Sequence, residues 1–330
     1  MADTKLMKSH TNYYTFHGLR ISISGPPTVS ATIHKRLRQF LTDGHDPIDL
    51  TFEFCCVPDY GTHLVERPLG RSRPVYKPLK VEIVYFDIEN KLYINYVDRV
   101  RVLCDLNRGH ARVSFLGSEL DNLWFISHPM FTIPLTEFLK QRERYSLHAA
   151  GLCLDSKGLL IAGISGAGKS TLTIALLRTG FGFLSDDTVF LTRDREGLRM
   201  LAFPDEIDAT DETIRLFPEL HYLLQLPKRP GWPKRSIWAE EVYGVDFVRE
   251  CSPSVLVFPS VANAEKSVFR PMGRDEALFE LASNVLLTEP RASQSHLDVL
   301  GELIKKSKCY RLETGRDFDA LPTLFRELVN

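Results

Sequence analysis

The sequence predicts an α/β protein in two parts, a β-rich N-terminal domain over residues 1–143 and a C-terminal α/β domain over residues 144–330. In the first part, runs rich in β-branched and aromatic residues alternate with turn formers, which is typical of strands. From Tyr145 onward, apolar strands alternate with helical patterns, which is typical of an α/β domain. The charged stretch Lys140–Arg144 separates the two patterns and marks the expected boundary.

The N-terminal part is expected to consist mostly of strands. The strand candidates are Tyr13–Ser24, Asp49–Val57, Lys80–Tyr85, Lys91–Tyr96 and Ala111–Leu116. The other expected elements are a short helix at Lys35–Thr42, an exposed loop at Pro68–Pro78 and helical structure from Asn122 to Gln141. We find no catalytic motif in this part, so we expect it to recognise a substrate or a partner.

The C-terminal part begins with a predicted hairpin. A strand over Tyr145–Leu154 meets a turn at Asp155–Gly158, and a short apolar strand, Leu159–Ala162, leads away from it. A helix over Ser170–Thr179 follows and stops at Gly180, because glycine favours helix ends. The later candidates are strands at Leu198–Phe203, Ser254–Phe258 and Cys309–Glu313, and helices at Arg274–Leu287, Ser293–Lys306 and Asp317–Leu328.

The composition excludes several classes of function. The 41 basic and 42 acidic residues nearly cancel, so no overall charge points to nucleic acid or to an anionic membrane. We find no apolar run of roughly 18 residues, which a membrane-spanning helix needs, and no secretory signal at the polar N-terminus. The six cysteines form no CxxC pair and are expected to be buried thiols. These observations predict a cytoplasmic protein without a nucleic-acid partner or a membrane span.

A glycine-rich loop carries the strongest functional signal. Residues 163–170, GISGAGKS, match G-x-x-x-x-G-K-[ST] at every fixed position. Glycine lets backbone N–H groups wrap around phosphate oxygens, and the helix that follows adds the positive end of its dipole. The loop therefore predicts binding of ATP with Mg²⁺. The expected nucleotide contacts are Gly163, Ser165, Gly166, Ala167, Gly168, Lys169, Ser170 and Thr171.

Two adjacent aspartates follow the helix. Asp186 and Asp187 come directly after the apolar run Phe181–Leu184, where an acidic residue beside a phosphate loop can bind magnesium. Two carboxylates allow one to hold the metal while the other accepts a proton from an attacking hydroxyl. The alternative is a simple turn or helix cap at Ser185–Thr188. His148 is the remaining candidate, because the predicted hairpin brings its strand alongside the one that enters the loop.

These motifs together resemble a known family. The combination H-A-A-G, hairpin, GISGAGKST, short helix and FLSDDTV looks like the catalytic domain of HPr serine kinase/phosphorylase. It is closer still to the HPr-kinase-like proteins, some of which are kinases of lasso-peptide precursors. The resemblance covers Tyr145–Thr192 well and does not reach the N-terminal third. It implies a P-loop kinase domain of the HPr-kinase type, with a homo-oligomer as a further expectation.

The resemblance also implies roles for individual residues. The first aspartate, Asp186, would be the base toward a serine hydroxyl, with His148 supporting the site. Asp187 and Ser170 would lie at the magnesium ion, and Lys169 at the terminal phosphates. The chain departs from the family at one point, because we find no E-I-R-G-L-G signature downstream of the aspartates. HPr as a substrate and the reverse phosphorolysis reaction are therefore not implied.

Two further segments are weaker candidates. The acidic segment Asp205–Glu212 could add a metal ligand through Glu206 or Asp208, or could simply begin a solvated helix. The basic and aromatic segment Leu226–Trp238 could be a flap over phosphate or an acidic peptide, or a plain exposed loop. Neither segment is needed for the phosphate-loop reading.

The leading hypothesis is a kinase that transfers the γ-phosphate of ATP to a hydroxyl, in particular a serine of a peptide or protein such as a ribosomally made precursor peptide. The aspartate pair favours this, because transfer to an alcohol benefits from a base. The alternatives are a small-molecule hydroxyl kinase, a switch that only hydrolyses its nucleotide, and a non-catalytic nucleotide-binding protein. We find no N-K-x-D guanine motif and no L-S-G-G-Q transporter signature.

Overall fold

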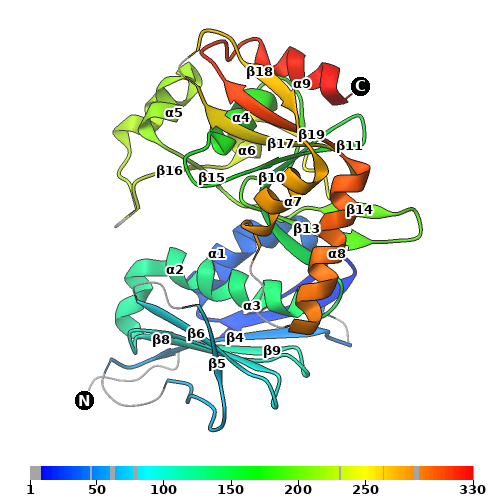
Figure 1. Ribbon diagram of the computed structural model, residues 1–330. Coiled ribbons are helices and arrows are strands. Elements are labelled where there is room, and N and C mark those ends of the chain that lie inside the picture. The colour runs from blue at the N-terminus through cyan, green and yellow to red at the C-terminus, as the bar shows by residue number, and fades with distance from the viewer. Residues whose placement is uncertain are drawn as a thin grey trace. The chain divides into compact units, whose positions relative to one another are not determined.

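The computed structural model describes residues 9–44, 47–59, 64–76, 80–229, 232–262, 264–285 and 290–329. The chain divides into two compact units, Met1–Arg142 and Glu143–Asn330. Both combine a large sheet with helices, so the mixed α/β class expected from the sequence is found (Figure 1). Among the described helices, none is both long and apolar enough to cross a membrane.

The first unit is built on a nine-stranded sheet in the order β3-β1-β2-β4-β9-β8-β7-β6-β5. Neighbouring strands run antiparallel except at two pairs, β2 with β4 and β4 with β9. Its strands are β1 His10–Phe16, β2 Leu19–Gly25, β3 Leu41–Thr42, β4 Leu50–Val57, β5 Arg73–Tyr76, β6 Val81–Phe86, β7 Lys91–Tyr96, β8 Val100–Asp105 and β9 His110–Leu116.

Helices cover one face of this sheet (Figure 1). They are α1 Pro27–Leu37, η1 Arg38–Phe40, η2 Gly117–Asn122, α2 Leu123–Ser127 and α3 Pro129–Lys140, where η marks a 3-10 helix. Phe52 of β4 packs edge-on against Phe131 and Phe138 of α3, with ring centroids 5.0 and 5.6 Å apart. The core of this unit therefore lies between the helices and the sheet.

Three sequence predictions for this unit were wrong in detail. The expected strand Tyr13–Ser24 is the hairpin β1–β2, because the chain turns at His17 and Gly18 with positive φ. The helix expected at Lys35–Thr42 begins earlier, at Pro27, since proline fits the first turn of a helix. The expected loop Pro68–Pro78 contains the edge strand β5, and its last two residues lie outside the described part.

The second unit contains two long strands, β10 and β17, that each pair with different neighbours along their length. Its strands are β10 Tyr145–Leu154, β11 Lys157–Ala162, β12 Gly182–Ser185, β13 Thr188–Arg193, β14 Leu198–Leu201, β15 Ile207–Ala209, β16 Arg235–Ile237, β17 Glu250–Val261, β18 Val268–Pro271 and β19 Lys308–Thr314. β10 pairs with β13 through its first half and with β11 and β12 through its second half. Because β14 joins β13 to β17 and β17 pairs with β11, these strands close into a ring.

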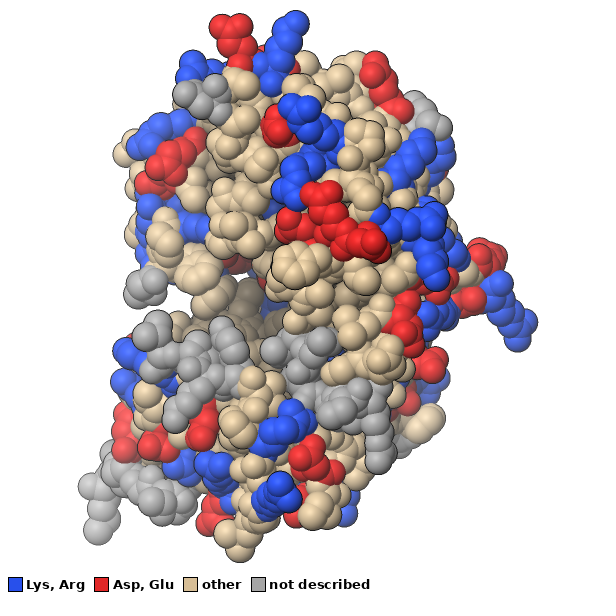
Figure 2. All heavy atoms as spheres, viewed as in Figure 1, with Lys and Arg blue, Asp and Glu red and all other residues tan. Residues whose placement is uncertain are grey.

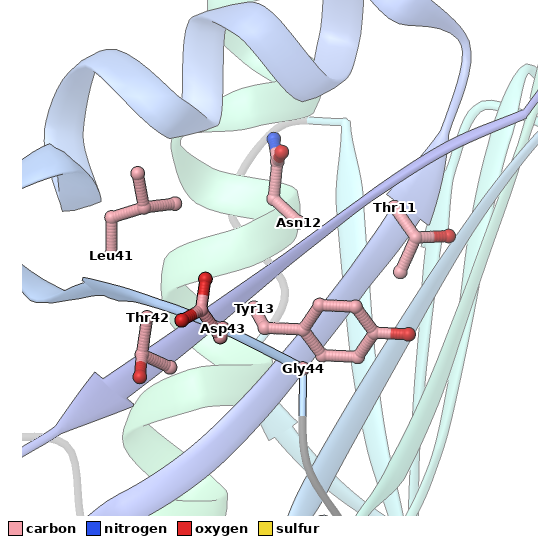
Figure 3. Close-up of a pocket in the computed structure, with 7 residues that line it drawn as sticks. All are labelled: Thr11, Asn12, Tyr13, Leu41, Thr42, Asp43 and Gly44. Carbon is pink, nitrogen blue, oxygen red and sulfur yellow. The ribbon is translucent and has the colours of Figure 1, made fainter.

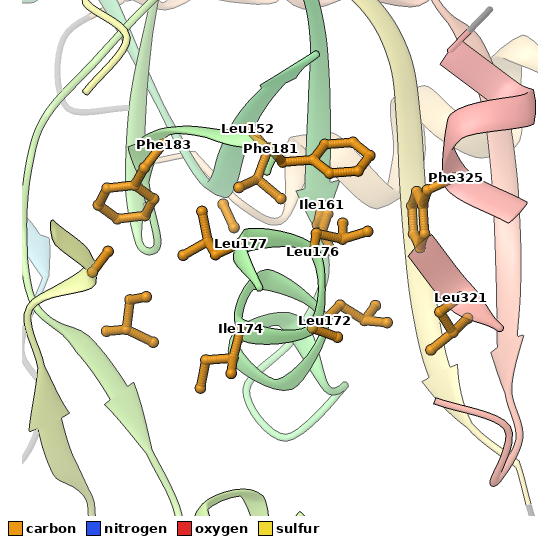
Figure 4. Close-up of a cluster of buried hydrophobic side chains, with 14 of the residues drawn as sticks. Leu152, Ile161, Leu172, Ile174, Leu176, Leu177, Phe181, Phe183, Leu321 and Phe325 are labelled. Carbon is orange, nitrogen blue, oxygen red and sulfur yellow. The ribbon is translucent and has the colours of Figure 1, made fainter. Parts of the chain in front are cut away.

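A parallel group of strands, β11, β17 and β19, forms the part of this unit that positions the loop. The helix after β11 is α4, Lys169–Leu177, and its apolar side chains are buried. Figure 4 shows Leu172 and Ile174 of α4 within a cluster that also holds Phe183 and Phe325. The helix is thus fixed on both sides, so its first turn has a defined position.

The remaining helices lie in the rest of the second unit. They are α5 Asp211–Arg215, η3 Pro218–Gln225, α6 Ala239–Tyr243, α7 Arg274–Ala282, α8 Pro290–Lys306 and α9 Leu321–Val329. The helix expected to reach Leu287 ends at Ala282, and residues 286 and 287 lie outside the described part. All six cysteines are free, and four of them are buried, whereas Cys55 and Cys56 are half-buried.

Candidate phosphate-binding site

The glycine-rich loop connects β11 to α4, as the sequence predicted. Three of its glycines, Gly163, Gly166 and Gly168, have φ values of 149°, 86° and 98°. A side chain at these positions would be strained by the backbone angle alone, and a Cβ built on Gly166 would meet nothing within 4 Å. The glycines are therefore required by the shape of the backbone and not by crowding.

The loop presents backbone N–H groups to solvent. Ile164, Ser165 and Gly166 are exposed, and Ala167 N–H donates to the Ile164 carbonyl at 3.2 Å. Within the described part of the chain, the amides of Ser165, Gly166 and Gly168 have no acceptor. Amides at the start of a helix bind anions readily, because the helix dipole adds positive charge there.

Lys169 lies over this loop. Its Nζ donates to the carbonyls of Gly163 at 2.7 Å and Ile164 at 3.3 Å. Burial lowers the pKa of Lys169, and the nearby carboxylates of Asp187 and Asp186 oppose that shift. The ammonium group is therefore held at the loop by weak neutral acceptors, which a phosphate oxygen can replace.

Asp186 lies beside the first turn of α4. The Ser170 hydroxyl donates to its Oδ2 at 2.8 Å, and the residue is only 6% exposed. Burial raises the pKa of Asp186 to about 6, although the Ser170 hydrogen bond opposes the shift. Its other oxygen, Oδ1, is buried without a hydrogen-bond partner among the described residues. A serine hydroxyl and an unpartnered buried carboxylate oxygen fit a magnesium ion, which prefers oxygen ligands.

Asp187 faces the opposite side of the chain and meets His148. The His148 Nδ1 lies 3.1 Å from Asp187 Oδ1, with side-chain exposures of 41% and 64%. The hydrogen bond with Asp187 raises the pKa of His148 despite partial burial. Desolvation opposes ionisation of Asp187, but the hydrogen bond and charge of His148 outweigh it and lower the pKa of Asp187.

The β10–β11 hairpin explains why His148 is near the loop. Ala149 pairs with Ala162, the last residue of β11, so His148 comes one residue beyond the end of the hairpin pairing, next to where the loop begins in the chain. The same strand pairs with β13 so that His148 lies opposite Thr188, and Ala149 N–H donates to the Asp187 carbonyl at 3.1 Å. The expected hairpin is therefore confirmed, although its turn is Asp155–Ser156 alone, because β11 already begins at Lys157.

The two aspartates differ from the expected grouping. The loop motif and the resemblance together placed Ser170 and Asp187 at one magnesium ion, whereas in the structure Ser170 contacts Asp186 and His148 contacts Asp187. The reason is local, because Asp186 and Asp187 form the bend between β12 and β13, where the chain changes direction. One aspartate thus faces α4 from within, and the other faces solvent.

The two weaker candidate segments pair with each other. Asp208 of β15 accepts hydrogen bonds from Arg229 at 2.7 Å and from Trp232 at 2.9 Å. Asp211 pairs with Lys228 and Arg235 at 2.9 and 3.0 Å. The acidic and basic side chains of the two segments neutralise one another. These pairings account for their charges without a mobile flap or a metal site. Residues 230 and 231 lie outside the described part.

A contact that sequence reasoning missed links this paired region to the loop helix. The Thr171 and Thr213 hydroxyls lie 2.9 Å apart, and Thr213 is in turn joined to the cap residue Thr210 of α5. A threonine directly before a helix, such as Thr210, is a capping signal, but the partner of Thr213 on α4 is distant in sequence. Within the described residues, no cluster of three or more His, Cys, Asp or Glu side chains forms a metal centre.

A polar hollow of about 580 Å³ lies elsewhere, in the first unit beside β1 and β3 (Figure 3). It is lined by Thr11, Asn12, Tyr13, Leu41, Thr42, Asp43 and Gly44. Among these residues Asp43 is the single carboxylate and no base accompanies it. The chemistry described above is therefore not located at this hollow.

The comparisons with known proteins agree with the motifs. The chain is 33% identical over 91 residues to HPr kinase/phosphorylase from two strains of Limosilactobacillus reuteri, DSM 20016 and JCM 1112. These 91 residues are similar to HPr kinase/phosphorylase. They make up 27% of this chain and 27% of each relative, and no family model matches.

A solved structure is also similar. The Hpr(Ser) kinase/phosphatase from Coxiella burnetii is 18% identical, with a TM-score of 0.30, over 56% of this chain and 93% of that chain. The curated relatives confirm the resemblance read from the sequence over the 91 residues that they match.

Proposed function

We propose that this protein is an ATP-dependent kinase that transfers the γ-phosphate to a hydroxyl, in particular a serine of a peptide or protein. The observation that carries the proposal is the pair of contacts Ser170–Asp186 and His148–Asp187, at 2.8 and 3.1 Å, on the flank of one glycine-rich loop. A site that only binds nucleotide needs no exposed carboxylate with its own histidine. Transfer to a hydroxyl is accelerated by one, because the proton of the hydroxyl must leave.

The loop and Lys169 act on the phosphates in this proposal. The amides of Ser165, Gly166 and Gly168 donate to phosphate oxygens, and the exposed loop leaves room for them. Lys169 exchanges its carbonyl acceptors for the terminal phosphate oxygens. Because burial lowers the pKa of Lys169, the ammonium gains most from a dianionic partner.

The magnesium side of the site consists of Ser170 and Asp186. Their hydroxyl and carboxylate oxygens would hold the ion, and the buried Oδ1 of Asp186 supports this assignment. When bound, magnesium supplies charge neutralisation on the phosphate oxygens. This assignment exchanges the roles that the family resemblance implied for the two aspartates.

Asp187 is the base in this proposal. As the acceptor oxygen bonds to the γ-phosphorus, the bond to the bridging oxygen breaks, and the acceptor proton passes to Asp187. The pKa of Asp186 is closer to neutral, but Asp186 is buried and already accepts a hydrogen bond from Ser170. A general base must first lie within hydrogen-bond distance of the proton that it takes, and the exposed Asp187 meets that condition better. His148 holds the Asp187 carboxylate in place through Nδ1.

The first unit has the role of recognising the acceptor in this proposal. Its long sheet carries no catalytic motif, whereas the loop, the aspartates and His148 all belong to the second unit. A protein that begins at Glu143 is expected to bind ATP like the full chain and to lose at least about tenfold in transfer to the peptide acceptor. Equal transfer by the shortened protein would remove the recognition role.

Label transfer from γ-labelled ATP tests the kinase proposal. We expect label on serine peptides, including ribosomally made precursors of the lasso type, faster than on water or on small alcohols. Label released only to water would make the protein a nucleotide-hydrolysing switch. Label on small alcohols alone would make it a small-molecule kinase.

A further inference from the structure

The two flanks of the glycine-rich loop differ in chemistry. β11 has β10 on one side and β17 on the other. The β10 flank carries His148 and the Asp187 carboxylate that it contacts. The β17 flank carries no such pair and ends in Val261, whose side chain is 74% exposed. A ligand that spans the loop would therefore meet a polar side and an apolar side.

β17 runs past the end of β11 and alongside the loop. The last pair of these strands is Ile161 with Val257, so β17 continues for four more residues. A Cβ built on Gly163 would lie 3.8 Å from Pro259 Cδ, and one built on Gly168 would lie 3.9 Å from Val261 Cγ2. Val261 therefore lies close to Gly168, the cap residue directly before the phosphate-binding helix.

The backbone around Val261 is braced. Ala262 N–H donates to the Thr314 carbonyl at 2.9 Å, and Arg316 N–H donates to the Ala264 carbonyl at 3.1 Å. Val261 itself pairs with Thr314, at the C-terminal end of β19. In sheets with parallel strands, ligands bind at the C-terminal ends of the strands. Val261 is exposed, and backbone hydrogen bonds fix its position at this end of the sheet. It therefore offers an apolar contact to a ligand without rearrangement.

We propose that Val261 contacts the nucleoside of the bound nucleotide, so that the site prefers a nucleoside triphosphate to inorganic polyphosphate. The inference rests on the proposed function. The γ-phosphoryl group and the nucleoside are at opposite ends of a triphosphate chain. With the γ-phosphate at the His148 flank, the nucleoside leaves the loop at the opposite flank, where Val261 offers apolar surface to a base or ribose.

Paired titrations with magnesium–ATP and magnesium–tripolyphosphate test this contact. The parent protein is expected to bind ATP about tenfold more tightly than tripolyphosphate, the size expected for one aliphatic contact. Val261→Ser removes most of that ratio, and Val261→Tyr increases it by stacking on the base. Tripolyphosphate affinity stays constant in all three proteins. Ile88→Ser, at an 85% exposed aliphatic residue of the first unit, is the matched control and leaves both affinities unchanged.

The outcomes separate this inference from the proposed function. Equal affinities of the parent for ATP and tripolyphosphate would overturn the nucleoside contact and leave the kinase proposal intact. An unchanged ratio in both Val261→Ser and Val261→Tyr would also overturn it. Failure of the parent to bind either ligand would overturn the proposed function, and the nucleoside contact with it.

Discussion

The two units hold their buried acidic groups in opposite ways. In the first unit, Glu137 and Lys140 lie one turn apart on α3, each 1% exposed, with Oε1 and Nζ 2.9 Å apart. In the second unit, Asp186 is buried beside a second aspartate, and one of its oxygens has no partner among the described residues. In the first arrangement the carboxylate has an ammonium partner at hydrogen-bond distance, whereas the Asp186 carboxylate has the neutral Ser170 hydroxyl as its hydrogen-bond donor.

This difference separates a structural charge from a functional one. A buried ion pair is neutral overall and contributes little beyond what an apolar pair would. A buried carboxylate with a raised pKa, next to another carboxylate and a phosphate loop, is costly until a cation arrives. The comparison predicts that substitutions in α3 affect stability, whereas substitutions at the loop affect activity.

The largest effect is expected at Lys169. Lys169→Ala removes the cation that faces the phosphates and is expected to lower turnover at least about a thousandfold, with the fold intact. Nucleotide titration and steady-state transfer measure the effect. Lys305→Ala, at an exposed lysine of α8, is the control and should behave like the parent. Normal turnover in Lys169→Ala would show that the loop is not the active site.

Breaking the pair on α3 is expected to affect stability strongly. Lys140→Met leaves the Glu137 carboxylate buried without its ammonium partner and should lower the free energy of unfolding by about 3–5 kcal/mol. The double variant Glu137→Leu/Lys140→Met should recover most of that loss. Denaturant unfolding measures both. A single variant as stable as the double one would show that this pair is not a closed unit.

Replacing Asp186 is expected to stabilise the protein, whereas replacing Lys140 is expected to destabilise it. The folded state holds the Asp186 proton up to a pKa of about 6, above the ordinary value of 3.8. Between these pH values the folded state binds more protons than the unfolded state, so stability falls as pH rises. Asp186→Asn, without nucleotide or magnesium, should therefore raise the free energy of unfolding by about 2–3 kcal/mol at pH 8. The gain should vanish near pH 4, and a variant less stable than the parent at pH 8 would contradict the account.

Local signals made part of this structure predictable. The turn at Asp155–Gly158 between two apolar runs predicts the β10–β11 hairpin, and the glycines predict a loop with positive φ. The helix that begins at Pro27 was missed because Gly-Pro-Pro reads as a turn. Proline ends a helix from within but fits its first turn.

The roles of the two aspartates depend on information that is not local. Asp186 and Asp187 form the bend between β12 and β13, and Asp186 is buried whereas Asp187 is exposed. Which one is buried depends on how β12 and β13 pair with β10, because those pairings set the direction of each side chain. The contact of Thr171 with Thr213 is likewise invisible, since the two residues are distant in sequence.

In the proposed reaction, Asp187 takes the proton and Asp186 binds the metal. Single-turnover transfer to the acceptor hydroxyl, at saturating ATP and over a range of magnesium concentrations, tests it in Asp186→Asn and Asp187→Asn side by side. Asp187→Asn is expected to slow transfer at least about 100-fold at every magnesium concentration, with normal ATP affinity. Asp186→Asn is expected to raise the magnesium concentration for half-maximal transfer. The reverse pattern, with Asp187→Asn rescued by magnesium and Asp186→Asn slow at saturation, would contradict the account.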